Sequence, residues 1–295
     1  MFADAIEKVG GFTRPVKIIS RKYKETAVLP GLATLFFVND EGWAVTCKHV
    51  ADEIIHADQL NKKYDQFRKE RAALSGKNAA ASLKKLELVH GFKAGQTVQM
   101  KVAFAGSVSG IREFDINRHP DYDLALIHFK QYDKLLYTGH AVFAKDGKAV
   151  RPGDFLCRLG FPFPEYADFR YDAATDDIVW DASAGSSNTP RFPIEGMFTR
   201  HLAGKDGKVY GLEISTPGLR GQSGGPLFDS RGVIWGMQSA TKHLHLGFDM
   251  IGEKMKLGGR EQVVNNQPFL HVGQCIHVDI IKAFLDQYGV KYYTE

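Results

Sequence analysis

The chain has 295 residues, of which 44% are hydrophobic and 24% charged, a composition typical of a globular protein with a large core. Its net charge of +4 is too small to imply a nucleic-acid partner. No stretch approaches the roughly 18 apolar residues of a membrane-spanning helix, and the N-terminus lacks the apolar segment of a signal peptide. We therefore expect a cytoplasmic protein without a membrane partner.

Cysteine usage agrees with a reducing compartment. The three cysteines, Cys47, Cys157 and Cys275, are odd in number and form no C-x-x-C pair. This pattern favours neither a disulfide framework nor a zinc site. Each cysteine lies in an apolar, strand-like stretch, so we expect buried thiols, with no metal and no cofactor.

The first half of the chain is predicted as strands with one helical interruption. Residues 12 to about 50 and 96–130 alternate or run apolar in the manner of strands. Residues 51–90 break this pattern, because "KKYDQFRKERAALSGKN" and "AAASLKKLELV" are rich in helix formers. The residues at helical spacing in the first of these segments are Leu60, Tyr64, Phe67 and Leu74. A break at 75–78 separates the two predicted helices.

This helical insertion has two possible roles, both open at the level of sequence. It is either a packed surface decoration or a lid, an exosite or a partner surface near a functional cleft. In the second case residues 53–90 contact a protein partner or a large substrate.

The second half is predicted as a linker, strands and a terminal helix. Residues 136–152 contain the turn-rich "KDGKAVRPGD", and strand patterns return over 153–276 around a polar loop at 181–193. "DIIKAFLDQYG" predicts an amphipathic helix that Gly289 can end. The residues on its apolar face are Ile280, Ile281, Phe284, Leu285 and Tyr288.

The stretch "GLRGQSGGPLFD", residues 218–229, carries the strongest chemical signal. Ser223 has small neighbours, so its hydroxyl is open to a ligand. Gly221 and Gly224 let the backbone turn sharply and bring its N–H groups close to that ligand. The stretch predicts either an activated serine beside an anion site or an ordinary tight turn.

Two arrangements of a serine hydrolase fit this stretch. The pattern G-x-S-x-G is also the nucleophile elbow of α/β-hydrolase esterases, and Asp249 and His271 follow Ser223 in the order that fold requires. An elbow needs a helix after the serine, whereas Gly-Gly-Pro and the "DSRG" turn predict a strand, a turn and a strand. In the other arrangement His49, Asp123 and Ser223 follow one another in the chymotrypsin order.

With "WAVTCKHV" around His49, "DLALI" at Asp123, "GQSGGPLFD" around Ser223 and "GVIWGMQSA" after it, the sequence resembles the trypsin/chymotrypsin-fold serine endopeptidases. "GDFLCRLGFPF" and "CIHVDIIKAFL" resemble the start and end of the family's second barrel. Within the family, the chain is closer to the bacterial HtrA-like and related intracellular-type branch than to digestive trypsins, and we expect no PDZ domain after the terminal helix. HtrA-type trimer regulation is therefore not carried over.

The resemblance implies an all-β fold of two six-stranded antiparallel β-barrels. The N-terminal barrel would cover 1–135, including the insertion at 51–90. The segment 136–152 would be a linker, and 153–295 would hold the C-terminal barrel and its terminal helix.

The resemblance also implies a mechanism for cleaving protein or peptide substrates. Ser223 would be the nucleophile, His49 the general base, and Asp123 the group that orients the imidazole. The N–H groups of Gly221 and Ser223 would form the oxyanion hole. Ser239 would support Asp123, although an ordinary strand serine is the alternative.

Substrate recognition follows from the same resemblance. Pro217 would lie at the floor of the primary pocket, with Thr241 and Gly273 on its walls, and Ser239, Ala240 and Thr241 would pair with the substrate main chain. Pro217 offers no negative charge, so a preference for Arg or Lys is not expected. We expect small or medium apolar side chains before the cut bond, with acidic or amide side chains as the alternative because histidines lie nearby.

Three further expectations concern control and competing functions. Gln222 precedes the nucleophile and cannot compensate a buried ammonium, so a new N-terminus should not be the switch, and "KVGGF" at 8–12 is predicted as a loop. The histidines of "HLH" at 243–245 are more typical of a surface than of a metal site. A catalytically silent scaffold is the main competing function, although the sequence retains every triad residue.

Overall fold

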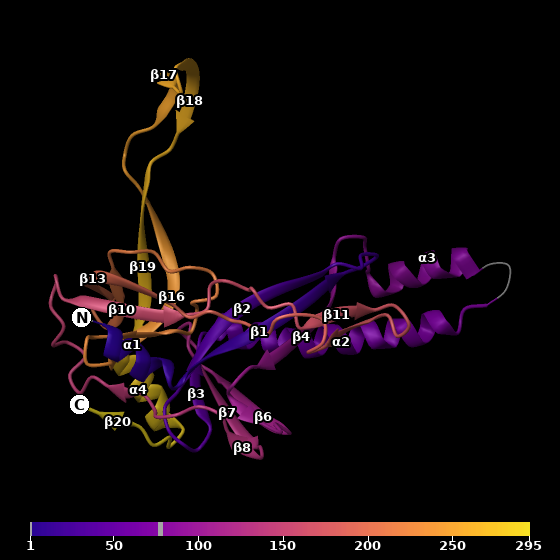
Figure 1. Cartoon of the computed structure of the whole chain (residues 1–295), viewed down its shortest axis with the longest axis horizontal. Coiled ribbons are helices and arrows are strands. Elements are labelled where there is room, and N and C mark those ends of the chain that lie inside the picture. Colours follow the sequence, from indigo (N-terminus) through magenta and orange to yellow (C-terminus); the bar gives the residue numbers. More distant parts are fainter. Residues whose placement is uncertain (1, 76–78) are drawn as a thin grey trace.

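The computed structural model describes residues 2–75 and 79–295. Two antiparallel sheets form the body of the molecule, and two arms project from it in different directions (Figure 1). The all-β fold class is therefore confirmed. In the described part of the chain, no helix is long and apolar enough to cross a membrane.

The N-terminal sheet contains six strands in the order β4–β1–β2–β3–β7–β6. Their bounds are β1 Thr13–Lys22, β2 Val28–Phe37, β3 Trp43–Thr46, β4 Thr97–Phe104, β6 Glu113–Arg118 and β7 Ala125–Gln131. Among the described residues the two end strands, β4 and β6, are not paired with each other, so the sheet is more open than the expected barrel. Strand β4 packs against helix α2, Lys48–Ala72.

The C-terminal sheet closes on itself. Six strands follow one another in the order β15–β10–β13–β14–β19–β16, and pairing of β15 with β16 completes the ring. Their bounds are β10 Phe155–Gly160, β13 Phe192–Ala203, β14 Val209–Ile214, β15 Pro226–Phe228, β16 Val233–His245 and β19 Phe269–His277. The short strands β9, Val142–Phe143, and β20, Tyr293–Thr294, extend the sheet beside β16. The predicted linker thus contributes a strand to this sheet.

The two sheets share one core. Phe36 and Phe129 of the first sheet belong to the same buried cluster as Phe228 and Met237 of the second. Burial of this continuous apolar surface favours docking of the two sheets, because association removes apolar area from water.

The helices at the two ends of the chain pack onto this core. Helix α4, Val278–Gln287, is the predicted terminal helix, and Gly289 follows it with φ +64° as a helix-ending glycine does. Helix α1, Ala3–Gly10, buries Ala5 and Val9, which are one turn apart. The prediction of a loop for "KVGGF" was therefore wrong over residues 8–10, because this apolar spacing gives the segment a core-facing side.

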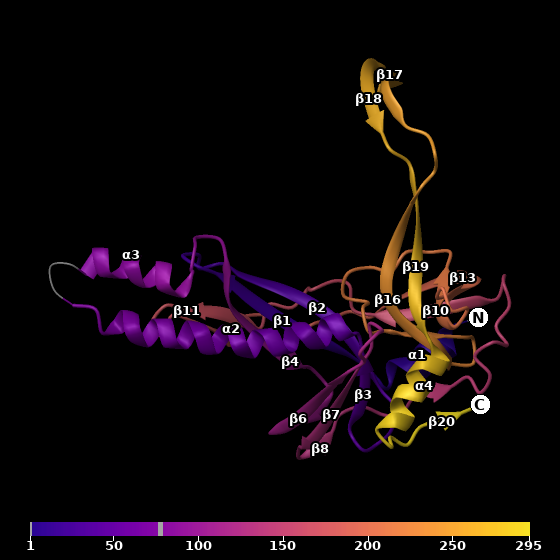
Figure 2. The same ribbon diagram turned by 180° about the vertical axis from the view of Figure 1, so that it is seen from behind.

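The helical arm consists of α2 and α3, Ala79–His90, and points away from the body of the molecule (Figures 1 and 2). Tyr64 and Phe67 of α2 are buried against Tyr23, Phe92 and Val98. The predicted apolar stripe therefore covers the chain's own strands. The predicted break lies largely outside the described residues, because 76–78 are not part of them.

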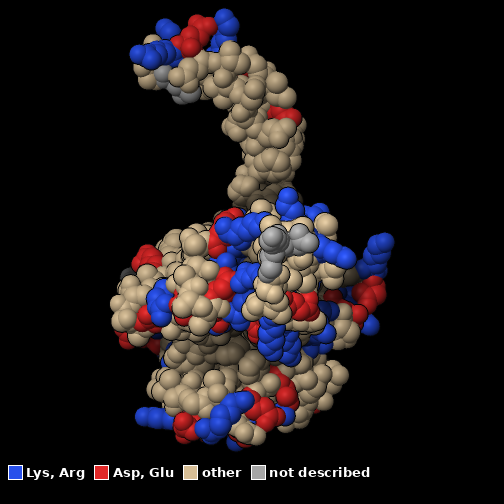
Figure 3. Space-filling model, turned by 90° about the vertical axis from the view of Figure 1, so that its right-hand side faces the viewer, with Lys and Arg blue, Asp and Glu red and all other residues tan. Residues whose placement is uncertain are grey.

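Three two-stranded sheets complete the described part of the fold, and the last two of them are hairpins. They are β5–β8, Val108–Ser109 with Lys134–Leu135; β11–β12, Phe169–Asp172 with Asp177–Trp180; and β17–β18, Met250–Leu257 with Arg260–Asn266. The β11–β12 hairpin lies beside the helical arm (Figure 1), and the predicted polar loop follows it before β13. Strands β16 and β19 continue outward into β17 and β18 as a hairpin arm that carries few charges along its stem (Figure 3).

Candidate active site

His49 and Asp123 meet at one end of the N-terminal sheet. His49 lies in the first turn of α2, three residues after the end of β3 and two after Cys47, whereas Asp123 lies just before β7. His49 Nδ1 is 3.0 and 2.9 Å from the two Asp123 oxygens, and the His49 backbone N–H donates to Oδ1 at 3.0 Å. The Ser239 hydroxyl donates to Oδ2 at 2.5 Å. The carboxylate is therefore held on both oxygens, and Ser239 contacts it as the resemblance implied.

These contacts set the charge states of the pair. Burial opposes ionisation of Asp123, but the hydrogen bonds from His49 and Ser239 outweigh it and lower the pKa of Asp123 to about 2. The hydrogen bond to Asp123 raises the pKa of His49 above its ordinary value, against the opposing effect of burial. Near neutral pH the carboxylate is ionised, and it favours the imidazolium that a general base becomes.

Ser223 lies on the loop between β14 and β15, and the loop conformation requires glycine at two positions. Gly221 has φ +89° and Gly224 has φ +86°, in the left-handed region. A Cβ at Gly221 would lie 2.2 Å from the Phe161 carbonyl oxygen, and one at Gly224 would lie 2.1 Å from that of Thr34. The N-terminal sheet also holds this loop directly, since Thr34 N–H donates to the Ser223 carbonyl at 2.9 Å and Thr34 Oγ1 donates to the Gly221 carbonyl at 2.6 Å.

The loop presents hydrogen-bond donors beside the serine. Within the described hydrogen-bond network, neither the Gly221 nor the Ser223 N–H donates to another protein group. Two such groups can receive a developing oxyanion. In the same described network Ser223 Oγ forms no hydrogen bond with His49, a contact that is commonly long until substrate binds.

A cavity of about 430 Å³ opens next to Ser223. It is lined by Pro217, Gly218, Leu219, Arg220, Ser223, Gln238, Ser239, Ala240, Thr241, His243 and His271. Four of the five residues expected at the substrate site are therefore on its wall. Gly273 is not, but it pairs with Thr241 across β16 and β19 and lies just behind that wall.

Sequence reasoning missed Arg158, which lies behind the same wall. A Cβ on Gly273 would lie 2.1 Å from Arg158 Nη1, so glycine at 273 makes room for the guanidinium. The available signal was a charged residue inside the apolar strand "FLCRLG", which is buried from Leu156 to Gly160.

The residues that an α/β-hydrolase would need do not meet Ser223. Asp249 Oδ1 is 2.6 Å from His245 Nε2, and His271 Nδ1 is 2.6 Å from His243 Nδ1. A short strand, not a helix, follows the Ser223 loop. The esterase alternative is therefore wrong, because it requires a different fold around the serine.

Cys47, His49 and Asp123 place three potential metal-ligand atoms within 4.8 Å of one another. Burial raises the pKa of the Cys47 thiol well above its ordinary range, and the Asp123 oxygens already accept bonds from His49 and Ser239. A protonated thiol is a poor metal ligand. We assign these residues to the His–Asp pair and its packing.

Gln222 is fully buried within the nucleophile loop. Its Nε2 donates to the Phe192 carbonyl at 3.0 Å, and its Oε1 accepts from Leu219 N–H at 3.0 Å. The amide thus ties the loop together with neutral hydrogen bonds, in a position where a carboxylate would be needed to receive an N-terminal ammonium.

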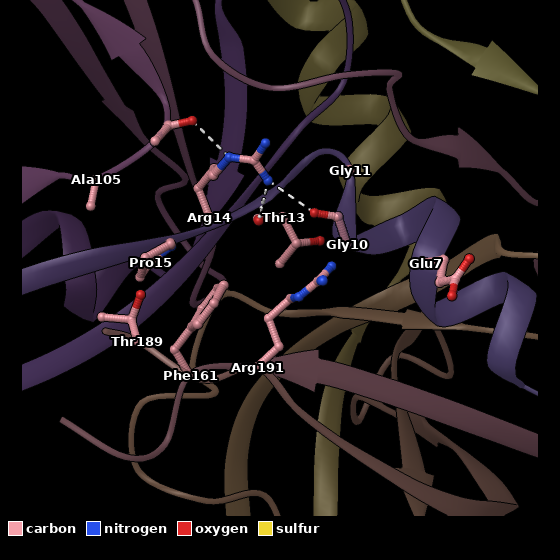
Figure 4. Close-up of a pocket in the computed structure, with 11 residues that line it drawn as sticks. Glu7, Gly10, Gly11, Thr13, Arg14, Pro15, Ala105, Phe161, Thr189 and Arg191 are labelled. Atoms are coloured by element: carbon pink, nitrogen blue, oxygen red, sulfur yellow. Dashed lines mark hydrogen bonds between the residues drawn. The ribbon is translucent and has the colours of Figure 1, made fainter. Parts of the chain in front are cut away.

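A second cavity, of about 540 Å³, lies between α1, β1 and the start of β13 (Figure 4). Arg14 donates there to the carbonyls of Gly106, Gly10 and Thr13 at 2.7–2.9 Å, and burial together with Arg191 lowers its pKa. No predicted site residue lines this cavity. The cavity beside Ser223 is the one that the chemistry can use.

A comparison with family models identifies the family of the chain. A family model, the trypsin-like peptidase domain, matches residues 33–237, which are 205 of the 295 residues. No curated protein matches the chain. Among solved structures, one that is similar is a variant of the HtrA-type protease AlgW with a tripeptide, with a TM-score of 0.47 and 13% identity over 97% of this chain. The chain spans only 63% of that protein's chain. By the match over most of its length, the chain belongs to the trypsin-like peptidase family.

Proposed function

We propose that the protein cleaves protein substrates through an acyl-enzyme formed on Ser223. The observation that carries this proposal is the Asp123 carboxylate, whose Oδ2 lies 2.9 Å from His49 Nδ1 and accepts from the Ser239 hydroxyl, while its Oδ1 accepts from the His49 backbone N–H. A carboxylate fixed in this way selects the imidazole tautomer whose Nε2 can accept a proton.

The chemistry follows from these positions. Ser223 Oγ attacks the scissile carbonyl while His49 Nε2 takes its proton, and the resulting oxyanion accepts hydrogen bonds from the Gly221 and Ser223 N–H groups. Collapse of this intermediate breaks the C–N bond, and His49 gives the proton to the leaving amine. Water then attacks the acyl-enzyme with His49 again as the base, which releases the acid and restores Ser223.

The substrate main chain would bind along β16. Ser239, Ala240 and Thr241 line the cavity beside Ser223, at the point where β16 leaves the nucleophile site. An extended peptide can add to such an exposed strand by main-chain hydrogen bonds. This would place the side chain before the cut bond in the cavity.

Labelling with a fluorophosphonate probe tests the proposal. We expect the probe to modify Ser223, as located by peptide mass spectrometry, and His49→Ala to abolish the reaction. Turnover of a peptide substrate should fall on the order of 10⁴-fold in Ser223→Ala, with the double variant little worse, because the triad acts as a unit.

Two control variants sharpen this test. Ser230→Ala removes an exposed serine of the same barrel and should leave labelling and turnover unchanged. His271→Ala should leave Ser223 reactive, since His271 contacts His243 and not the serine. A folded protein with no reactive Ser223 would instead be the silent scaffold, the competing function.

The helical arm is the remaining candidate for a partner surface. We infer that residues 53–90 contact a protein partner or a large substrate, chiefly through α3. Its Leu88 and Val89 are 79% and 73% exposed, whereas the apolar side chains Tyr64 and Phe67 of α2 are buried in the chain's own cluster. Adjacent exposed aliphatic side chains of this kind are more typical of a contact surface than of a solvated helix.

A further inference from the structure

A buried arginine lies directly behind the wall of the cavity beside Ser223. Arg158, on β10, has 0% of its surface exposed. Its Nη1 donates to Gln238 Oε1 at 2.8 Å, and its Nη2 donates to the carbonyl and hydroxyl oxygens of Thr216 at 3.0 and 2.5 Å. Its Nε has no hydrogen-bond partner. No carboxylate of the described residues lies within ion-pair distance of the guanidinium.

The positions of these partners connect the guanidinium to the cavity. Gln238 lines the cavity, and its amide links Arg158 on one side to the Ala240 carbonyl, at 2.8 Å, on the other. Thr216 immediately precedes Pro217, the predicted floor. The charge therefore lies one side chain behind the surface that a substrate would touch.

The cavity wall adds one cationic side chain, that of Arg220, and contains no Asp or Glu. Within the described ion pairs Arg220 has no carboxylate partner. Nothing on the wall compensates the charge of Arg158.

Packing alone does not account for an arginine at this position. Guanidinium groups stay protonated in proteins, and an unpaired buried charge is costly. An aliphatic side chain would fill the same strand position without that cost, and buried ion pairs can often be replaced by apolar groups without loss of stability. A positive charge kept beside a cavity is complementary to an anion that enters it.

We infer that this cavity takes an acidic side chain, so that the enzyme cuts after Glu or Asp, and that Arg158 determines this specificity. This goes against the apolar preference expected from Pro217 and selects the acidic alternative. The inference rests on the proposed function, since the cavity selects a substrate only if Ser223 cuts it. Arg158 acts through space and through Gln238, because the field of a charge is weakly screened in a buried, low-dielectric region.

The test compares substrates that differ in charge but not in shape. Internally quenched peptides of one sequence carry Glu, Gln, Asp, Asn, Leu or Lys before the scissile bond, and kcat/KM is measured for each with the full chain. We expect Glu over Gln, and Asp over Asn, by about tenfold or more, as for one charge-assisted interaction. Faster cleavage after Gln, Leu or Lys than after Glu would overturn the inference.

Two variants assign the effect to Arg158. Arg158→Met keeps the length of the side chain without its charge, and the Glu-to-Gln ratio should fall toward one. Gln238→Glu places a carboxylate against Nη1 and on the cavity wall, so it compensates the guanidinium and should also lower the Glu-to-Gln ratio even if Arg158→Met does not fold. Arg151→Met, at an exposed arginine shortly before β10, is the matched control and should keep the wild-type ratio. A preference for Glu that survives both Arg158→Met and Gln238→Glu contradicts the role of Arg158.

A covalent readout tests the assignment of the pocket separately from the proposed function. Peptidyl diphenyl phosphonates with a Glu or a Gln side chain should modify Ser223 at different rates, again about tenfold apart. Equal rates, or reaction with neither compound in a protein whose Ser223 is labelled by a fluorophosphonate, overturn the pocket assignment alone. Failure of every probe to modify Ser223 overturns the proposed function and with it this inference.

Discussion

Arg21 and Arg158 are both buried in strands, yet their surroundings differ. Arg21, 3% exposed, donates to Gln99 at 2.7 Å, to the Glu25 carbonyl at 3.0 Å and to Tyr64 at 3.0 Å, and it forms an ion pair with Asp176 at 2.9 Å. Arg158 has only neutral acceptors and an unpaired Nε. The charge of Arg21 is therefore compensated within the fold, where the residue has a structural role. The charge of Arg158 is not compensated and can interact with a ligand.

The network around Arg21 explains how the helical arm is attached. Asp176, a non-glycine residue with φ +50°, accepts hydrogen bonds from Arg21 and Tyr171 on one oxygen and from Tyr64 and Arg71 on the other, all at 2.7–2.9 Å. One carboxylate thus joins β1, α2 and the β11–β12 hairpin. A fully satisfied polar group of this kind fixes the relative positions of the elements that contribute to it.

The strongest test of this difference between the two arginines is to remove the carboxylate of Asp176. Asp176→Ala leaves the buried charge of Arg21 without a carboxylate partner, as is the case for Arg158. We expect it to lower the free energy of unfolding by about 3 kcal/mol. Urea denaturation measures the loss. Asp58→Ala, on α2, is the matched control and should change stability little, since its pair with Lys62 is exposed to solvent. A small effect of Asp176→Ala would mean that the arm is held by its apolar contacts alone.

Arg158→Met should destabilise the protein less than Asp176→Ala does, and lower the free energy of unfolding by less than about 2 kcal/mol. The variant gives up hydrogen bonds to Gln238 and Thr216 but also removes an unpaired buried charge, and the two effects offset each other. The same urea titration provides the measurement. If Arg158→Met lost as much unfolding free energy as Asp176→Ala, Arg158 would have a structural role like that of Arg21.

The His49–Asp123 pair is an intermediate case, because its side chains are 51% and 30% exposed. Its raised His49 pKa predicts that kcat/KM falls on the acid side with a midpoint above pH 6.5, where protonation removes the base. Asp123, with a pKa of about 2, stays ionised throughout this range. The contribution of His49 to stability is complete below pH 6.5 and is lost as the pH rises through its folded pKa. An acid limb below pH 6.5 in the pH–rate profile would contradict this assignment.

The smallest effect is expected on α3 of the helical arm. Replacing Leu88 and Val89 of α3 with serine should leave the cleavage of short peptides unchanged, because these exposed side chains lie outside the cavity beside Ser223. Cleavage of the protein target should change. Lys85→Ser, on the same helix, is the control for a polar surface change. If every variant cleaved both the short peptide and the protein target at the wild-type rate, the arm would be only a packed surface element.

Much of the architecture was accessible from sequence because it depends on local patterns. Alternating apolar residues predicted the strands, and "DIIKAFLDQYG" predicted the terminal helix with its glycine end. Ser223, His49 and Asp123 lie in distinct short motifs, so their grouping could be expected before their contacts were known. The helix over "ADAIEKVG" was missed because an eight-residue segment makes only about two turns, too few for a periodic pattern to stand out.

The specificity of the cavity was not accessible, because it depends on residues far apart in the chain. Arg158, Thr216, Gln238 and Gly273 come from four different segments and meet only when the C-terminal barrel closes. Pro217 alone predicted an uncharged floor. A buried charge that approaches from behind the wall has no local pattern of its own, apart from one arginine in an apolar strand.

The bonds from Thr34 to the nucleophile loop have a consequence for unfolding. Thr34 belongs to the N-terminal sheet, whereas Ser223 and Gly221 belong to the C-terminal half, so the shape of the loop depends on contact between the two. At a denaturant concentration that loosens this contact while both sheets keep their secondary structure, Ser223 should therefore lose its reactivity. The rate of probe labelling at Ser223 would then serve as a gauge of domain docking, and it would decline before the far-ultraviolet circular dichroism signal does.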